Sequence, residues 1–465
     1  MLTITLDPHA PTPIYLQLYS AIKDRIIRKE LAPDTILPSK RALALHLGVS
    51  IKTIENAYSQ LLMEGYIYSI EKKGFYVSLL DDYRTRKEPP RAYVSRFAED
   101  TYPVDLKSNK HALSDFPSAT WCRLMRETLS AQSEQLFDTV PFNGVPRLRI
   151  AIARYLHDFR GMDVSPDQII VGAGTEYLYG RLIQLLGQNA HYAIEDPGYN
   201  KIRAIYKSNG ASYTAVPVDR EGIRMDLLNR SAANIVHISP AHHFPLGFVT
   251  PITRRLELLQ WVNAAAGRYI IEDDYDSEYR YRGVSAAPLY SIDIRNKVIY
   301  MNTFSKSVSP AVRISYMVLP EPLMDQYIST LNFYSCTVSS FEQYTLADFI
   351  EGGYLERHIN RMKRRGAAAR DMLIHMITHS PLNPRVHIKE DEAGSHILLK
   401  LQTDLEDTEV ISRLKSAGIL VSAVSDCCEK DLPEYHSTLI VNYSGITEKQ
   451  AGYFVEHLSS IIAVS

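Results

Sequence analysis

From about residue 104 to residue 320, short apolar segments alternate with longer segments of helical periodicity, and this alternation constrains the fold more than any other feature. The apolar segments cover residues 168–174, 191–199, 234–243, 269–275, 297–306 and 313–320. Strands separated by helices predict a mostly parallel sheet that is covered by helices. In such sheets ligands bind at the carboxyl ends of the strands, so polar residues at strand ends are candidate site residues.

The first 80 residues show a different pattern, of three short helices followed by a hairpin. The helices are expected over residues 13–31, 37–48 and 49–67, and the hairpin over residues 66–80. Ser39 and Ser50 are the expected N-caps of the second and third helices. Two helices joined by a short turn and followed by a hairpin predict a winged helix-turn-helix, whose last helix enters the major groove of DNA.

Small polar and basic side chains lie where such a head would meet DNA. They are Ser39, Lys40, Arg41, Ser50, Lys52, Thr53, Lys72 and Lys73. Side chains of these types can reach phosphates and base edges. Residues 1–80 contain 9 Lys and Arg against 7 Asp and Glu. One head alone is therefore expected to bind DNA weakly, because affinity depends largely on the phosphates that are neutralised, and two heads in a dimer would bind more tightly.

Residues 81–103 are charged, contain two adjacent prolines and lack a clear period. They are expected to form a linker between a head, residues 1–80, and a body, residues 104–465. The formal charge of −2 indicates no strongly acidic or basic partner for the whole molecule. No apolar run approaches the roughly 18–20 residues that span a bilayer, and the four cysteines lack the spacing of a zinc site. A cytoplasmic protein with reduced thiols and no metal is expected.

Polar and aromatic side chains gather near the ends of the expected strands of the body. The turn at Gly174 opens a helix whose N-terminus favours an anion. Tyr199 ends the next strand, and a later strand ends in carboxylates followed by Tyr275. Lys306 lies in a turn rich in Ser and Thr, and Arg313 follows it. Pyridoxal 5′-phosphate (PLP) needs such a set, because it has an aldehyde for a lysine, a ring nitrogen for a carboxylate, a flat ring and a phosphate.

The two halves of the chain also resemble known families. Residues 37–44 (LPSKRALA) and 49–67 resemble the GntR family of DNA-binding domains. The order of glycine turn, aromatic residue, Asp-x-Tyr, Ser-x-Lys and arginine resembles the fold type I aminotransferases. Together the halves resemble the MocR/GabR family of regulators, and residues 144–161, 240–247 and 358–362 look like that family too. The resemblance implies a PLP-dependent transferase fold, with a mostly parallel large-domain sheet and a smaller C-terminal α+β domain.

The same resemblance implies a role for each residue of the cofactor site. Lys306 would form a Schiff base with PLP, Asp273 would pair with the ring nitrogen, and Tyr275 would bind the phenolate oxygen. Tyr199 would stack on the ring. Asp274 is rejected for the role of Asp273, because the Asp-x-Tyr spacing of the family selects the residue two before Tyr275. The phosphate would be held by Gly174, Thr175, Glu176 through its amide, Thr303, Ser305 and Arg313.

One departure from the aminotransferases concerns the grip on the substrate carboxylate. They usually carry an arginine in the strand before the last helix. Residues 438–445 align with that strand, and Ile440 or a neighbour falls at the place of the arginine. The candidates for effector contact are Lys201, Arg203, His242 and His243, with Arg357 or Arg361 as alternatives for a carboxylate. The two histidines are equally consistent with polar filling.

Three functions fit these observations. The first is a regulator in which PLP or an amine or amino-acid effector controls operator binding. The second is an active aminotransferase whose head tethers it to DNA, and the third is a repressor whose body no longer binds cofactor. The fused head and the missing arginine favour the first, while the intact lysine and Asp-x-Tyr argue against the third. Because fold type I enzymes build their sites at a dimer interface, the resemblance also implies a homodimer.

Overall fold

The computed structural model describes residues 3–8, 10, 12–80, 101–108, 115–131, 133–279, 287–389 and 394–463. The chain divides into two compact units, Met1–Glu99 and Asp100–Ser465, which are called the head and the body below. Of the predicted linker, residues 81–100 lie outside the described part, and Pro103 already accepts a hydrogen bond from Gln450 of the body (3.0 Å). Within the described ranges, no helix has the length and apolar character that a membrane crossing requires.

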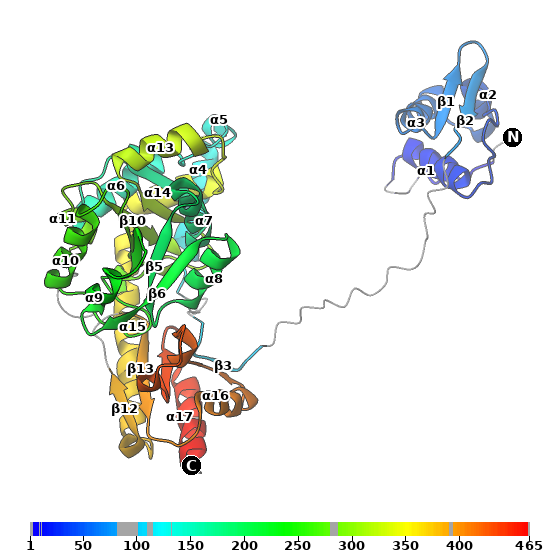
Figure 1. Cartoon of the computed structure of the whole chain (residues 1–465). Coiled ribbons are helices and arrows are strands. Elements are labelled where there is room, and N and C mark those ends of the chain that lie inside the picture. The colour runs from blue at the N-terminus through cyan, green and yellow to red at the C-terminus, as the bar shows by residue number, and fades with distance from the viewer. Residues whose placement is uncertain are drawn as a thin grey trace. The chain divides into compact units, whose positions relative to one another are not determined.

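The head contains the three helices and the hairpin that the sequence predicts (Figure 1). They are α1 (Ile14–Ile27), α2 (Lys40–Leu47), α3 (Ile51–Met63), β1 (Ile67–Ile70) and β2 (Gly74–Val77). Ser39 caps α2 by accepting a hydrogen bond from the amide of Ala42 (3.2 Å), and Ser50 caps α3 in the same way through Thr53 (3.1 Å). All five elements contribute to one apolar core, which fixes how α3 is presented to the surface.

The body is built on an eight-stranded sheet. Its strands, in spatial order, are β4 (Ile169–Gly172), β11 (Ser315–Val318), β10 (Val298–Thr303), β9 (Tyr269–Asp273), β8 (Ile235–Ile238), β5 (His191–Asp196), β6 (Ser212–Asp219) and β7 (Gly222–Ile223). The pairs from β10 to β6 are parallel, whereas β11 runs antiparallel to both of its neighbours. Because β11 is reversed, Arg313, which precedes it, reaches the same edge of the sheet as residues that follow the parallel strands.

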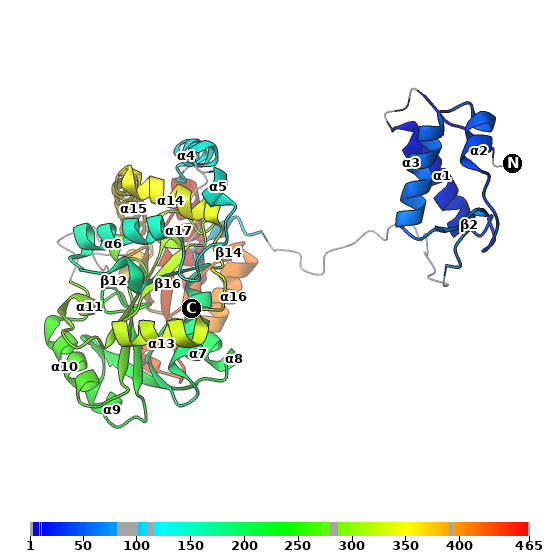
Figure 2. The same ribbon diagram turned by 90° about the horizontal axis from the view of Figure 1, so that it is seen from above.

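Helices cover both faces of this sheet (Figures 1 and 2). One face packs against α4 (Ser118–Ala131), α6 (Pro146–Arg160), α10 (Ile252–Asn263) and α14 (Ser340–Glu351). The other face packs against α7 (Thr175–Leu186), α8 (Asn200–Ser208) and α13 (Glu321–Leu331). Ile270 and Ile271 of β9 face opposite helix layers and are both buried. The sheet is therefore the middle layer of three, as expected for alternating strands and helices.

A smaller C-terminal domain completes the body. Its antiparallel sheet has the order β12 (Val386–Lys389), β13 (His396–Leu401), β16 (Thr438–Asn442) and β15 (Ser422–Ala423). Its helices are α15 (Tyr354–Thr378), α16 (Asp407–Ser416) and α17 (Glu448–Ala463). At the start of the body, β3 (Val104–Asp105) pairs in parallel with β14 (Ile419–Leu420), so the first residues of the body belong to this domain. The strand that contains Ile440 is β16, the strand before the last helix.

The remaining elements are short. They are α5 (Ser133–Leu136), α9 (Met225–Leu228), α11 (Leu289–Ile292), α12 (Phe304–Ser307), η1 (Pro166–Gln168), η2 (Ser277–Tyr279), η3 (Asn383–Arg385), η4 (Ser425–Cys427) and η5 (Pro433–Tyr435). Of these, α12 is the turn that carries Lys306, and it follows β10 directly.

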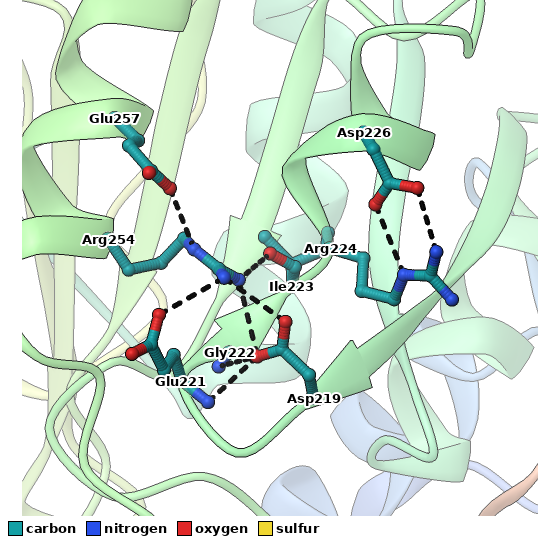
Figure 3. A network of polar contacts seen from close by, with 8 residues as sticks. All are labelled: Asp219, Glu221, Gly222, Ile223, Arg224, Asp226, Arg254 and Glu257. Atoms are coloured by element: carbon teal, nitrogen blue, oxygen red, sulfur yellow. Dashed lines mark hydrogen bonds and ion pairs between the residues drawn. The ribbon is translucent and has the colours of Figure 1, made fainter.

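A polar network ties the β6–β7 turn to α10 (Figure 3). Arg254 donates to Asp219 (3.1 Å), Glu221 (3.3 Å), Glu257 (2.8 Å) and the carbonyl of Ile223 (2.6 Å). A guanidinium group that serves several acceptors is held in one orientation. This network therefore fastens the turn between β6 and the edge strand β7.

Candidate functional site

A cavity of about 1040 Å³ lies between the strand ends of the large sheet and the small domain. Asp273 and Thr303, at the ends of β9 and β10, line it from the large sheet. Ile440 and Asn442 of β16 line it from the small domain. The cavity is thus at the place where doubly wound sheets bind their ligands, beyond the carboxyl ends of parallel strands.

The cavity brings the predicted cofactor residues together. Those in its lining are Thr175, Glu176, Tyr199, Asp273, Tyr275, Thr303, Ser305, Lys306 and Arg313. Gly174 is the N-cap of α7 and has a φ of +93°. A Cβ at Gly174 would clash with the guanidinium group of Arg313. The glycine therefore permits a close approach that puts a cation beside the N-terminus of a helix, which is a suitable setting for an anion.

Lys306 is held in its turn by contacts from three segments. Thr303 caps α12 by accepting a hydrogen bond from the amide of Ser305 (3.1 Å), and the hydroxyl of Ser315 donates to the same oxygen (2.7 Å). The hydroxyl of Tyr279 donates to the carbonyl of Lys306 (2.8 Å). These contacts fix the backbone from which the side chain of Lys306 reaches the cavity.

The surroundings of Lys306 alter its protonation. Burial lowers the pKa of Lys306, and the negative charges of Asp276 and Asp273 act in the opposite direction. A lower pKa increases the fraction of neutral amine, which is the form that attacks an aldehyde. The site therefore favours a nucleophilic lysine over a solvated ammonium group.

The two adjacent aspartates at the end of β9 have different neighbours. Asp274 binds Arg160 (2.6 Å) and the hydroxyl of Tyr300 (2.6 Å) and is absent from the cavity lining. Asp273 lines the cavity and accepts a hydrogen bond from Tyr179 (2.5 Å). Each has a buried Oδ1 atom without a hydrogen-bond partner among the described residues. Only the oxygen of Asp273 belongs to a residue of the cavity, where a protonated ring nitrogen would satisfy it.

The residues predicted to bind the phosphate differ in whether their polar groups already have partners in the chain. The hydroxyl of Ser305 is buried and has no partner within the described ranges. Arg313 is half exposed and lies 3.8 Å from Glu176. The hydroxyl of Thr303 is already engaged as the cap of α12, so the structure gives this residue a structural role as well. Its contact with a phosphate stays a prediction.

The two aromatic candidates also line the cavity. Burial and the charge of Asp276 raise the pKa of Tyr275 well above its usual range, so its hydroxyl stays protonated and can donate a hydrogen bond. The amine of Lys306 lies 6.0 Å from the centre of the Tyr275 ring. Tyr199 is 48% exposed, and its ring meets Phe244 edge-on with the centroids 5.6 Å apart. The stacking of Tyr199 on a cofactor ring stays a prediction.

The structure divides the predicted effector residues. Lys201 and Arg203 line the cavity, but Lys201 forms an ion pair with Glu176, and Arg203 forms one with Glu429 (3.0 Å). Arg357 and Arg361 are absent from the lining. Both arginines donate to backbone carbonyl oxygens instead.

His242 and His243 are buried and absent from the cavity lining. His242 lies 2.7 Å from Asp276, and His243 stacks on Phe248 with the ring centroids 4.3 Å apart. Burial lowers the pKa of His243 to about 3, so this ring is neutral. Of the two interpretations, the structure favours polar filling, because neither ring forms part of the cavity wall.

Several lining residues were missed by the sequence analysis. They include Tyr179, Glu195, His237, His396 and Asn442. His237 follows the strand-end rule on β8, and its Nε2 lies 3.8 Å from Asp273. Burial raises the pKa of Glu195 to about 8. His396 and Asn442 come from the antiparallel sheet of the small domain, where no strand-end rule applies.

The predicted DNA-binding residues lie on α2 and α3, at the N-caps of these helices (Ser39 and Ser50) and in the turn of the hairpin. Arg41 and Lys52 are exposed, as are the two lysines of the hairpin turn. Glu55 lies 3.1 Å from Lys40 and 3.4 Å from Lys52, and these two ion pairs lower the pKa of Glu55. The positive charge of this face is therefore partly neutralised by one carboxylate.

Both units match known families. Residues 14–77 match the family of bacterial regulatory proteins called gntR, and residues 103–458 match aminotransferase class I and II. The HTH-type transcriptional regulator YdeL of Bacillus subtilis is 35% identical to this chain, and the match covers 94% of each protein. The probable rhizopine catabolism regulatory protein MocR of Rhizobium meliloti is 31% identical, over 96% of this chain and 93% of that protein.

A third relative and two solved structures extend the comparison. The HTH-type pyridoxine biosynthesis transcriptional regulator PdxR of Corynebacterium glutamicum is 30% identical over 91% of each chain. An archaeal alanine:glyoxylate aminotransferase has a TM-score of 0.70 and 20% identity, over 79% of this chain and 92% of that one. A multiple substrate aminotransferase from Thermococcus profundus has a TM-score of 0.69 and 23% identity, with the same coverage. These structures show that the body has the fold type I aminotransferase fold.

Proposed function

We propose that the body of this chain binds PLP and thereby controls operator binding by the head. The chain belongs to the MocR type of HTH transcriptional regulators, in which a GntR head is joined to a body of the aminotransferase class I and II family. The observation that carries the proposal is that Lys306 and Asp273 line the same cavity. Asp273 has a buried oxygen that lacks a partner among the described residues. A buried acceptor of this kind is costly unless a ligand satisfies it.

The other residues of the cavity fit the cofactor too. When bound, PLP supplies an aldehyde that bonds to an amine and a ring that withdraws electrons. Asp273 would hold a proton on the ring nitrogen by its charge, and Tyr275 would donate a hydrogen bond because its hydroxyl stays protonated. Gly174, Arg313 and the start of α7 would hold the phosphate.

The cavity wall formed by the small domain favours regulation of DNA binding over catalytic transamination. An aminotransferase needs a cation to hold the substrate carboxylate while the proton moves. Ile440 and Asn442 occupy that wall, and Ile440 is 5% exposed. Lys201 and Arg203 are in ion pairs with carboxylates of the chain. An effector amine would therefore bind without being converted to a keto product. The second candidate, an active aminotransferase, is supported by the complete set of lysine, aspartate and tyrosine.

We further propose a homodimer that works in the cytoplasm on operator DNA with two half-sites. Members of this fold build their sites at a subunit interface, and a two-fold dimer presents two heads to two half-sites. Light scattering on the purified protein at micromolar concentration should give twice the chain mass. A monomer at that concentration would contradict the dimer and leave the cofactor proposal standing.

The test of the proposed function measures absorbance, DNA affinity and product on one sample. The purified protein should be yellow, and a binding amine should shift its spectrum and change its affinity for operator DNA. Little or no keto product should form. Steady turnover at the roughly 1–1,000 per second typical of enzymes would favour the aminotransferase instead. A spectral shift without any change in DNA affinity would show that body and head are not coupled.

A further inference from the structure

The first described residues of the body form part of the wall of the cavity. Lys107 and Ser108 line it together with Leu420 of β14 and Ser422 of β15. They are brought there because β3, which immediately precedes Leu106, pairs with β14 (Val104 opposite Ile419). The segment that enters the body from the linker is thus also a wall of the cavity.

A turn fixes the place of Lys107. One carboxylate oxygen of Asp105 accepts hydrogen bonds from the amides of Lys107 (3.1 Å) and Ser108 (2.9 Å). The other oxygen accepts a hydrogen bond from the Ser108 hydroxyl. Because the carboxylate bonds to backbone amides that follow it, the backbone of this turn is held while the side chain of Lys107 stays exposed. The turn therefore presents an ammonium group on a fixed base.

The charge of Lys107 is felt inside the cavity. Burial raises the pKa of the Cys427 thiol to about 12, and the positive charges of Arg203 and Lys107 act in the opposite direction. Cys427 lines the same cavity. Lys107 and Cys427 therefore belong to one cavity lining, in which the charge of Lys107 opposes the effect of burial on the thiol.

Lys107 also differs from the other cations of the cavity lining. Lys201, Arg203 and Arg313 each lie within ion-pair distance of a carboxylate, and Lys306 is the amine of the cofactor site. Lys107 forms no ion pair with any residue that the structure describes. An anion that enters the cavity would thus find Lys107 available without displacing a carboxylate of the chain.

We infer that Lys107 and Ser108 bind the anionic group of a small effector whose amine lies at Lys306. The inference rests on the proposed function, because it takes an amine at the cofactor site as given. Lys306 comes from the large sheet and Lys107 from the small domain, so the two ends of the effector contact opposite walls of the cavity. The effector class is an amine with a carboxylate or similar anion several bonds away. Ile440, at the usual place of the arginine, makes no such contact.

In this assignment the effector contacts the segment of the body that directly follows the linker. Residues 81–100 lead into residues 101–108, and Lys107 lies at the end of that segment. An anion bound there therefore contacts the turn through which the chain enters the body. An amine without an anionic group fills the cofactor end of the cavity and leaves this turn unchanged.

The experiment compares ω-amino carboxylates with alkylamines of the same length on the intact, PLP-loaded chain. The ratio of the two affinities, measured by absorbance titration, should favour the carboxylate in the native chain. Lys107→Ala should reduce that ratio about tenfold or more, as expected for a hydrogen bond to a charged group. Binding of the alkylamine should not change. Lys107→Arg should keep most of the preference, and Lys207→Ala, an exposed lysine on α8 outside the lining, is the matched control.

The outcomes separate this inference from the proposed function. A native chain without preference for the carboxylate, or a Lys107→Ala variant that keeps it, overturns the inference. If the preference is lost in Lys107→Ala but no amine changes operator affinity even in the native chain, the inference stands and the proposed control of DNA binding fails. If operator affinity responds to amines in the native chain but Lys107→Ala keeps the preference for the carboxylate, the control stands and the inference fails.

Discussion

The head and the body hold their functional side chains in opposite ways. In the head, the DNA-binding candidates lie between Ser39 and Lys73 on two neighbouring helices and a turn, and most of them are exposed. In the body, the cofactor candidates come from segments between Gly174 and Arg313 and meet only because the sheet aligns its strand ends. A change in the head should therefore alter recognition without disturbing the fold. A change in the body alters recognition and packing together.

The two sites also differ in electrostatics. Cations of the head form ion pairs at the surface, such as Lys52 with Glu55, where solvent and salt screen them. The body buries ionisable groups in the lining of its cavity, and burial raises the pKa of Glu195 to about 8. Salt should thus control the function of the head much more than that of the body.

The largest effect is expected for Lys306→Ala. This variant should lose the visible absorbance and all covalent attachment after borohydride reduction, because the amine that bonds to the aldehyde is gone. The head should keep its fold and its intrinsic contact with DNA. Mass spectrometry of the reduced protein is the measurement, and Lys449→Ala, an exposed lysine on α17, is the control. An adduct on another lysine would refute the assignment of Lys306.

A smaller effect is expected for Asp273→Asn. The neutral amide loses the charge that holds the proton on the ring nitrogen, and cofactor affinity should fall roughly 10- to 100-fold, as for a lost hydrogen bond to a charged group. The matched control is Asp274→Asn, which leaves Arg160 buried beside a neutral group. It should lower the thermal midpoint of the body rather than cofactor affinity. The same loss of affinity in both variants would contradict the distinction between them.

The next effect belongs to the head. Arg41→Ala should weaken operator binding about tenfold, within the 1–3 kcal/mol of a good contact, and should leave the absorbance of the body unchanged. Arg28→Ala, at the end of α1, is the control and should bind nearly as well as the native chain. Fluorescence anisotropy at two salt concentrations measures both. A changed absorbance spectrum in Arg41→Ala would show that the two sites are not independent.

The smallest effect is expected for Glu55→Gln, which should raise operator affinity rather than lower it. Removing the carboxylate that pairs with Lys40 and Lys52 frees two ammonium groups for phosphates, so operator affinity should rise a few-fold. The gain should shrink at high salt. An unchanged or lower affinity at low salt would mean that neither lysine contacts DNA.

The head was predictable because its signals are local. Ser39 and Ser50 stand directly before the helices that they cap, and a turn residue such as Lys72 lies between paired strands. In the body, the rule that ligands bind at strand ends pointed to the carboxylates at the end of β9 and to the turn with Lys306 after β10. The choice of Asp273 over Asp274 and the role of Lys306 came from the resemblance to the aminotransferases and not from the pattern of elements alone.

The rest of the site depends on packing that no local pattern shows. The pairing of Lys201 with Glu176 joins residues of two different helices, and that of Arg203 with Glu429 joins the two domains of the body. His396 reaches the cavity only because the small domain docks there. The sequence pattern contains no signal for the contact between the large-sheet domain and the small domain of the body.

The reversed strand β11 has a consequence for the order in which the body folds. The pairing of β11 with β10 closes a short loop that carries both Lys306 and Arg313, whereas its pairing with β4 joins residues far apart along the chain. Short loops close at a lower entropic cost, so the hairpin of β10 and β11 should form early and the docking of β4 late. Hydrogen exchange during refolding should protect Asn302, which pairs with Tyr316 of β11, before Ile170, which pairs with Met317. The turn at Gly174 would then be the last part of the phosphate site to form, so a partly folded chain would carry Lys306 and Arg313 on one hairpin before it could hold an anion.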